Sequence, residues 1–400
     1  MHLLRVQVPD FRGLKDIDIT FEKDFVPNIF PLGSQNGGGK STLLQLIFVL
    51  LHCSVDEEKK PFLENLLQGF KVTEGEEQRV LAIIDIWDGE KLVKLEFFCC
   101  KKTLSLGIML GDSNTNINSQ ELSSGDIDED INSEVIVDIC CVSKGKEKRS
   151  YAFPNKRVET ITLQCRFKNQ RKEQAQLFLD KISQKIFLAA PSTQVFLFLP
   201  PDSRKLLFSN SSNGDNYYGI LESARAKLQG LFTYDFLAVE LLIESFKDAR
   251  DRDFRKAIKT GSYGNSYQFL INDLNLLLGN KRINLNEDFS GVNFQLYNSG
   301  ETIELYPEDL SHGELKRLSI YIWLKFRNIE DAIVLMDEIE IAFHPDWQYQ
   351  IISDFKEWAP SNQYILATHS YALCEALTPA HVKEIEPKLI KQESNITNES

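Results

Sequence analysis

A glycine-rich stretch followed by lysine and serine carries the clearest chemistry in the sequence. Residues 30–44 read FPLGSQNGGGKSTLL. The spacing is close to G-x-x-x-x-G-K-[ST], in which glycine N–H groups surround phosphate oxygens, the lysine neutralises phosphate charge and the hydroxyl binds Mg²⁺. The alternative is a glycine-rich surface turn. The residues expected to bind ATP here are Asn36, Gly37, Gly38, Gly39, Lys40, Ser41 and Thr42.

Two features depart from the simplest form of this pattern. The first glycine is Gly33, so Ser34 occupies the position where the pattern has glycine. Pro27 and Pro31 lie in the apolar segment before the loop, although proline lacks the N–H that a central strand needs. The apolar run after the loop has the length of a helix, whose N-terminus would also face the phosphates.

An apolar segment ending in two acids supplies the next candidates. Residues 332–338 read AIVLMDE, which predicts a buried strand with Asp337 and Glu338 at its tip. Asp337 would bind Mg²⁺ together with Ser41, since Mg²⁺ prefers a few hard oxygen ligands. Glu338 would accept a proton from the attacking water. The alternative is a pair of solubilising acids at a strand end.

A second buried strand, residues 364–368, leads to His369, which would contact the γ-phosphate. With Lys40 and Glu338, this histidine completes the expected catalytic set. The alternative for His369 is a structural histidine. Glu340 and His344, just after the acids, fit either a dimer-contact loop or a polar turn.

The segment LSHGELKR, residues 310–317, opens an apolar helix and contains Ser311, Gly313 and Glu314. By itself it resembles a helix N-cap with a capping-box acid. Its place upstream of the acid pair and the histidine favours a functional motif. His312 stands in its middle position.

Composition and charge narrow the class of protein. The chain has 400 residues and a formal net charge of −13, which argues against a surface that coats nucleic acid generally. The longest apolar run, residues 43–53, is too short to span a bilayer, and the N-terminus lacks a signal-peptide pattern. A cytoplasmic protein without a membrane partner is expected.

Two charged stretches lie between the expected strands and helices. Residues 112–134 are polar and acidic and are expected to form a mobile loop. Basic residues crowd between Lys144 and Lys172, which fits a solvated face or a strip that contacts nucleic acid or a partner. Strands are expected at 3–8, 17–21, 79–87, 91–100, within 187–201, at 292–296 and 302–305, and helices over most of 224–278.

The motifs together resemble the ABC-type ATPase heads of the SMC, RecF and OLD branch. The loop resembles Walker A, and residues 310–314 resemble the signature motif. Residues 334–348 resemble Walker B with its trailing acid and His-Pro, and residues 367–370 resemble the switch histidine. Residues 9–21 are similar to the opening strands of these heads, where Arg12 would lie near the nucleotide.

The resemblance implies an α/β fold: a P-loop ABC-ATPase head with a mixed central sheet, an antiparallel β subdomain and a helical insertion. It implies the cofactors ATP and Mg²⁺. The expected division is 1–205 for an N-terminal ATPase lobe with the mobile acidic loop, 206–290 for the helical insertion, 291–386 for a C-terminal ATPase lobe, and 387–400 for a polar tail.

The resemblance also implies a mechanism. Two heads of a homodimer, or of a higher even oligomer, enclose two nucleotides, and Ser311 of one copy contacts the γ-phosphate held by Lys40 of the other. Gly313 and Glu314 belong to the same contact in trans. Hydrolysis would be slow and dependent on dimerisation.

Coiled-coil heptads are absent, and the chain after Ser370 is too short for the nuclease domain of OLD proteins. The remaining resemblance is to stand-alone ATPases of anti-phage defence systems of the Septu, retron-associated and PARIS types, which implies a separately encoded effector, such as a nuclease. One alternative is a RecF-like DNA-repair ATPase that binds DNA through the basic stretch. Another is a nucleotide-locked scaffold with little hydrolysis.

Overall fold

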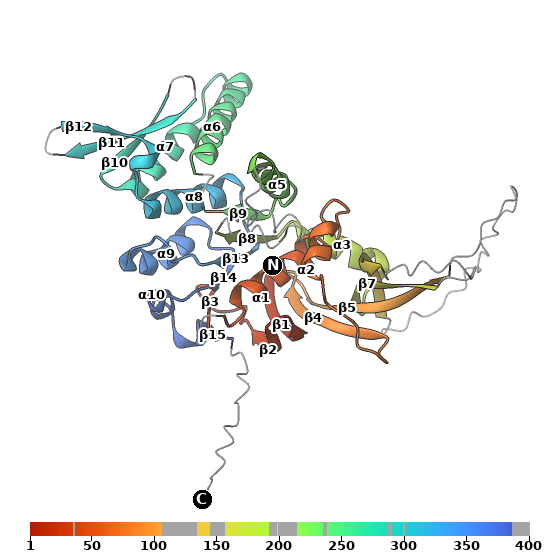
Figure 1. Ribbon diagram of the computed structural model, residues 1–400. Helices are drawn as coiled ribbons and strands as arrows, with labels where there is room; N and C mark the ends of the chain where they lie inside the picture. The colour runs from red at the N-terminus through yellow and green to blue at the C-terminus, as the bar shows by residue number, and fades with distance from the viewer. Residues whose placement is uncertain are drawn as a thin grey trace, which may run out of the picture.

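The computed structural model describes residues 1–34, 37–105, 134–144, 157–191, 198, 214–234, 238–286, 288, 290–298 and 301–385. Asn36, the acidic segment 112–133, the centre of the basic stretch at 145–156 and the expected polar tail lie outside these residues. The described strands form two six-stranded sheets and one three-stranded sheet (Figure 1).

The central sheet is parallel and has the order β15-β3-β14-β13-β8-β9. Alternate residues of its strands enter different cores: Ile333 and Leu335 lie in one, and Val334 and Met336 in the other. Burial on both faces explains why these strands are continuous apolar runs. The strands are β3 (Ile29–Gly33), β8 (Ile186–Ala190), β9 (Leu231–Thr233), β13 (Ile333–Asp337), β14 (Gln363–Ala367) and β15 (Lys383–Glu384).

The register of this sheet brings the candidate motifs together. In β14, Ala367 pairs with Asp337 of β13 on one side and with Leu32 of β3 on the other. The ends of the three strands therefore meet at one edge, although β3 lies about 300 residues before β13 and β14 in the sequence. This edge receives the loop after β3, the acids after β13 and the histidine after β14.

The position of Pro31 in β3 explains how the strand tolerates proline. The carbonyl of Leu32 accepts a hydrogen bond from the N–H of Thr368, just after β14, and that of Gly33 accepts one from Ile385, just after β15. The backbone groups of successive residues in a strand point to opposite neighbouring strands, so those of Pro31 point toward β15. There β15 pairs only with Leu32 and Gly33, so the missing N–H of Pro31 removes no bond between strands.

A second sheet is antiparallel, with the order β2-β1-β4-β5-β7-β6. The expected pairs are confirmed: β1 pairs with β2, and β4 forms a hairpin with β5. The parallel and antiparallel strands of the expected α/β fold thus occupy separate sheets. The strands are β1 (His2–Phe11), β2 (Leu14–Thr20), β4 (Gln78–Trp87), β5 (Leu92–Ser105), β6 (Glu134–Lys144) and β7 (Arg157–Lys168).

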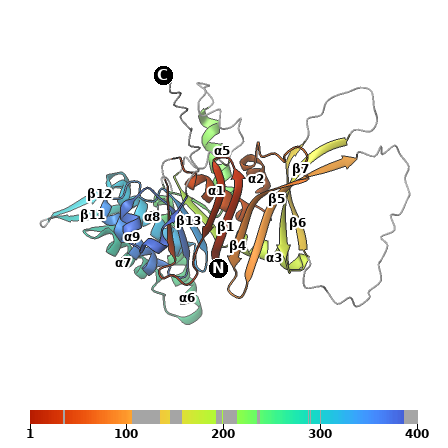
Figure 2. The same cartoon turned by 90° about the horizontal axis from the view of Figure 1, so that it is seen from below.

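Helix α1 (Lys40–His52) lies between these two sheets and contacts β8, β13 and β14 (Figure 2). Nearly all of its residues are buried, which explains an apolar sequence without a polar face. Helices α2 (Lys60–Leu66) and α3 (Lys172–Ser183) pack beside it.

The opposite face of the central sheet carries the second core. Sheet β10-β11-β12 adjoins α7 and extends to the edge of the molecule (Figure 1). The elements on this side are α6 (Ala238–Thr260), α7 (Ser266–Leu278), β10 (Lys281–Leu285), β11 (Val292–Asn298), β12 (Glu301–Leu305), α8 (His312–Phe326), α9 (Pro345–Trp358) and α10 (Tyr371–Glu375). Helix α5 (Gly214–Lys227) instead contributes Ala224 to the first core.

The segment 206–290, expected to be helical, contains α5, α6 and α7 and also the strands β9 and β10. The division of the chain into domains at 205, 290 and 386 stays a prediction. No helix in the described part of the chain combines the length and the apolar character that crossing a membrane requires.

Candidate nucleotide site

The phosphate loop, residues 33–41, connects β3 to α1 at the edge of the central sheet. Gly37 and Gly39 have φ of 80° and 88°, a region that favours glycine. A Cβ on Gly39 would lie 2.5 Å from Cδ2 of Leu14, so the start of β2 packs closely against the loop. Gly38 is buried, and Thr42 lies in the first turn of α1.

Lys40 is the buried cation of the site, with 6% of its surface exposed. Its Nζ donates to the carbonyl oxygen and Oγ of Ser34, at 3.1 and 3.0 Å, and lies 3.4 Å from Nδ1 of His369. The departure from glycine at position 34 therefore supplies an acceptor for this lysine. Burial lowers the pKa of Lys40, while Glu340, Asp337 and Glu338 oppose that shift.

Ser41 and Asp337 join the phosphate loop to the tip of β13. Oγ of Ser41 donates to Oδ1 of Asp337 over 3.0 Å. Asp337 is 3% exposed, and burial raises its pKa to about 6, although the bond from Ser41 opposes this shift. A hydroxyl and a carboxylate beside a phosphate loop are the hard oxygen donors that Mg²⁺ takes together with nucleotide phosphates, so these two residues fit the expected metal.

Glu338 begins the turn after β13 with φ of 52°, an unusual value for a residue other than glycine. Its N–H donates to the carbonyl of Ala367 over 3.0 Å, which ties the turn to the end of β14. Its own carbonyl accepts from Nζ of Lys316 over 3.1 Å. The backbone at Glu338 is thus held from two directions, while the carboxylate is half-buried.

Glu340 lies inside the site, which the sequence left undecided. Its Oε1 accepts from the backbone N–H of His369 over 2.7 Å, so it connects the acids to the histidine. Its Oε2 is buried without a hydrogen-bond partner among the described residues. The signal in the sequence is a further carboxylate two positions after Glu338.

The signature segment caps helix α8. Oγ of Ser311 accepts from the N–H of Glu314 over 3.2 Å, and the carboxylate of Glu314 accepts from the N–H of Ser311 over 2.9 Å. The capping-box interpretation is therefore confirmed as local structure. Burial would raise the pKa of Glu314, but the bond from Lys281 and those from Ser311 leave it lowered. Ser311 itself is exposed.

Gly313 sets how closely α8 approaches the turn after Walker B. A Cβ there would lie 2.6 Å from the carbonyl oxygen of Ala342 and 3.2 Å from the ring of Trp347. Only glycine fits this contact without displacing backbone.

Lys316 is a buried lysine that the motifs did not indicate. It is 5% exposed, and its Nζ donates to the carbonyls of Glu338 and Ile341 over 3.1 Å each. The same atom lies 3.9 Å from the centroid of the Tyr234 ring. Lys316 thereby connects the signature helix to the backbone of the acid turn.

Arg12 lies at the turn between β1 and β2, with φ of 54°. Its Nη2 donates to the carbonyl of Leu66 at the end of α2, over 2.7 Å. The expected role of Arg12 beside the nucleotide stays a prediction.

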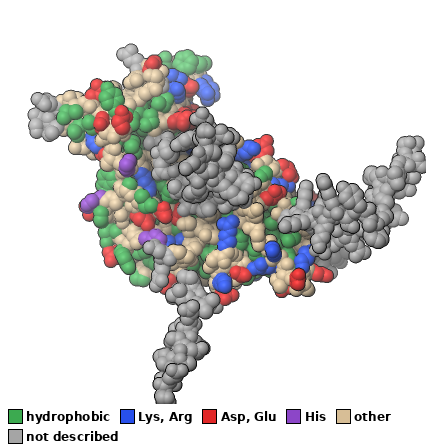
Figure 3. Space-filling view, in the orientation of Figure 1, with side chains coloured by type: hydrophobic (Ala, Val, Ile, Leu, Met, Phe, Trp, Pro, Cys, Tyr) green, Lys and Arg blue, Asp and Glu red, His purple; other side chains and the backbone are tan. Residues whose placement is uncertain are grey.

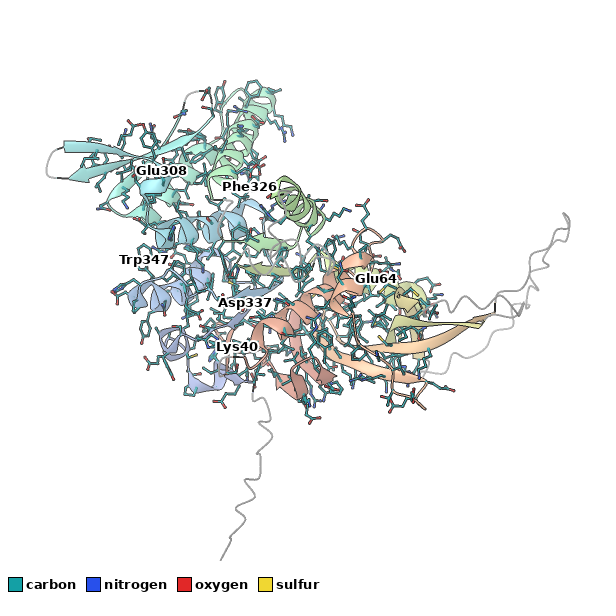
Figure 4. The ribbon with its side chains drawn as sticks, viewed as in Figure 1. Lys40, Glu64, Glu308, Phe326, Asp337 and Trp347 are labelled. Carbon is teal, nitrogen blue, oxygen red and sulfur yellow. The ribbon has the colours of Figure 1, made fainter. Side chains whose placement is uncertain are left out.

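Within one chain the signature segment and the phosphate loop are separated. Figure 4 places Lys40 and Asp337 near each other, while Glu308, just before the signature segment, lies far from both. Contacts in one copy therefore unite the loop, the acids and His369, whereas the hydrogen bonds of Ser311 to described residues stay at the start of α8.

The family described as AAA ATPase domain (AAA_15) matches residues 1–373. The chain belongs to the AAA ATPase domain family. A family match over nearly the whole chain confirms the resemblance to ATPases that the loop and acid motifs predicted.

A curated relative is the Retron Vc95 probable ATPase of Vibrio cholerae serotype O1 biovar El Tor. It is 37% identical over 69 residues, which span 16% of this chain and 13% of that protein. This AAA ATPase is therefore distantly related to a retron-associated ATPase.

Solved structures of Smc heads show a loose similarity. The head bound to the C-winged helix domain of ScpA has a TM-score of 0.40 at 12% identity, covering 94% of this chain and 92% of that chain. The Smc head domain derived from Pyrococcus furiosus has a TM-score of 0.39 at 16% identity, covering 94% of this chain and 91% of that chain. The SMC head domain from Thermotoga maritima has a TM-score of 0.39 at 8% identity, covering 94% of this chain and 92% of that chain.

Proposed function

We propose that this AAA ATPase binds ATP with Mg²⁺, dimerises around the nucleotide and hydrolyses it slowly. The observation that carries the proposal is the bond from Ser41 to Asp337, which brings a phosphate loop and a buried carboxylate to one edge of the sheet. Ser311 is exposed and, among the described residues, its side chain bonds only to Glu314, which supports completion of the site by a second copy.

The residues divide the chemistry among them. Lys40 and the glycine N–H groups neutralise and orient the phosphates. Ser41 and Asp337 would hold Mg²⁺, which would supply further positive charge beside the phosphates. Glu338 takes a proton from the attacking water, and His369 contacts the γ-phosphate. Ser311 of the second copy donates to that phosphate from the other side.

Glu338→Gln tests this assignment. The amide cannot take a proton, so ATP should bind but remain uncleaved and hold the dimer together. Light scattering after gel filtration with Mg²⁺ and ATP should show a stable dimer, with turnover reduced by about a hundredfold or more. Glu357→Gln, an exposed residue on α9, is the control. Unchanged turnover in Glu338→Gln would contradict the role of the acid and favour the nucleotide-locked scaffold.

We also propose that ATP turnover gates a separately encoded effector, such as a nuclease, in anti-phage defence. The short match to a retron-associated ATPase supports this proposal. Co-expression with the product of the adjacent gene tests it: an effector should co-purify and change its activity when Glu338→Gln replaces the wild type. A neighbour that encodes only housekeeping repair enzymes would count against it.

The RecF-like alternative depends on the basic stretch between Lys144 and Lys172. In its described part, Arg166 pairs with Glu96 at 2.8 Å and with Glu134 at 3.5 Å. Lys168 pairs with Glu134 as well, at 3.7 Å. These pairs reduce the charge available to phosphates. The alternative predicts ATP-strengthened DNA binding that weakens steeply with salt.

A further inference from the structure

The outer end of α6 presents hydrophobic side chains that the ATPase site does not use. Phe254 is 52% exposed and Ile258 is 70% exposed, and their spacing places them on one face of the helix. Tyr263, after the helix, is 69% exposed, and its ring centroid lies 6.4 Å from that of Phe254. We call Phe254, Ile258 and Tyr263 the α6 apolar surface.

A pocket of about 560 Å³ opens beside this surface, within the size range of ligand sites. It lies between the end of α6 and the start of α7, at the edge of the molecule away from α1 (Figure 1). Its lining includes Arg250, Asp251, Phe254, Tyr263, Tyr267 and Gln268. Three aromatic rings with a few polar groups suit a bulky apolar side chain.

Basic residues flank the apolar face. Arg255 and Lys259 follow Phe254 and Ile258 by one position each, so they form a parallel row on the same helix. Both are exposed and form no ion pair within the described residues, whereas Arg250 and Arg252 pair with Asp251 and Asp248. Figure 3 shows Lys and Arg side chains beside hydrophobic ones where Figure 1 places α6.

Both rows are unfavourable in the free protein. Like charges four residues apart destabilise a helix. Apolar side chains exposed to water have a higher free energy than the same side chains buried in a contact. An acidic protein segment with an aromatic or large aliphatic side chain would relieve both costs at once. A nucleic acid fits less well, because it carries a phosphate at every nucleotide and Asp251 and Asp253 line the pocket. A peptide can instead place its uncharged anchor in the pocket and keep its acidic residues beside Arg255 and Lys259.

We propose that the α6 apolar surface and its pocket bind an acidic segment of a partner protein that carries one bulky apolar anchor. We take this partner to be the separately encoded effector, and that identification rests on the proposed function. The binding itself requires neither ATP nor dimerisation, so the two can fail separately.

The probe is a phage-displayed library of random peptides about 12 residues long, selected on the full chain without ATP. Enriched peptides should be acidic and carry a large apolar residue. One synthetic enriched peptide is then titrated by fluorescence anisotropy. Phe254→Ser, Ile258→Ser and the double charge reversal of Arg255 and Lys259 to Glu should each weaken binding by about tenfold or more.

Leu177→Ser is the matched control, because Leu177 is 66% exposed on the distant helix α3. It should bind the peptide like the wild type, and all variants should keep the wild-type thermal unfolding midpoint. Enrichment of basic peptides, no enrichment, or binding indifferent to Phe254 and Ile258 would overturn the proposal. So would binding of single-stranded DNA of about 20 nucleotides that the same variants abolish.

Discussion

Three carboxylates and one lysine share a small, largely buried volume at the edge of the central sheet. Asp337, Glu338 and Glu340 all act on Lys40, yet the structure gives Lys40 acceptors from Ser34 instead of a carboxylate. Burial disfavours the ionised form of Asp337, and Glu338 and Glu340 add to this effect, so its pKa is raised to about 6 despite the hydrogen bond from Ser41. The site therefore carries an electrostatic cost that a bound cation would relieve.

Asp337→Asn should stabilise the nucleotide-free protein at pH 8 and abolish Mg²⁺-dependent turnover. The folded pKa lies above the ordinary value of 3.8, so the contribution of Asp337 to stability is present below pH 3.8 and lost as the pH rises through 6. The variant avoids that loss, so its free energy of unfolding should rise by about 3 kcal/mol at pH 8 and change little at pH 4.

Urea unfolding of both proteins at the two pH values, without nucleotide, measures this difference. An equal effect at pH 4 and pH 8 would show that ionisation of Asp337 is not the cause.

Gly39→Ala should weaken ATP binding more than Gly37→Ala does. Both glycines have positive φ, so alanine strains either position by about 1 kcal/mol. Only at Gly39 does the new Cβ meet a neighbour, Cδ2 of Leu14 at 2.5 Å, while nothing lies within 4 Å at Gly37. Titration with a fluorescent ATP analogue compares the two, and Leu14→Ala should partly restore binding to Gly39→Ala. Equal losses in the two single variants would contradict the steric explanation.

At the scale of elements, α8 joins the exposed signature segment to the buried acid turn. Ser311 begins this helix, and Gly313 packs against Ala342. Lys316, about one turn further on, reaches the carbonyls of Glu338 and Ile341. A contact made at Ser311 can therefore bear on the position of the acid through one rigid helix.

Lys316→Met should lower the free energy of unfolding by about 2 kcal/mol, because two carbonyls lose their donor. It should also lower kcat by about tenfold with little change in KM, since the lysine holds the acid turn and not the nucleotide. Steady-state kinetics and urea unfolding measure both effects. Lys325→Met, exposed on the same helix, is the control and should change neither. A raised KM at constant kcat would contradict the positioning role.

The strands whose side chains alternate in polarity or form apolar runs could be predicted from the sequence. A strand whose charged side chains form ion pairs with residues far away in the sequence could not. β3, β13 and β14 were predicted from apolar runs that end in functional residues. β7 was not, because Arg166 and Lys168 suggested a basic strip. Arg166 forms an ion pair with Glu96 on the neighbouring strand β5. Glu96 lies 70 residues earlier, so no local sequence pattern indicates this pair.

At the scale of the molecule, strand order decides which predicted residues meet. Parallel strands with adjacent carboxyl ends bring Lys40, Asp337 and His369 to one edge, as the motifs predicted. The roles of Lys316 and Glu340 could not be predicted, because they depend on how α8 and the acid turn pack. Ser311 is exposed and, among the described residues, bonds only at the start of α8, so the expected site is divided between this helix end and the sheet edge that holds Lys40.

The measurement that tests this division most directly mixes two inactive variants. Lys40→Ala removes the phosphate cation, and Ser311→Arg blocks the signature contact. Each alone should lose turnover. Mixed in equal amounts, half of the dimers contain one of each, and each such dimer has one intact composite site, so about a quarter of wild-type activity should return. Activity of Ser311→Arg alone, or no recovery in the mixture, would contradict a site shared between two copies.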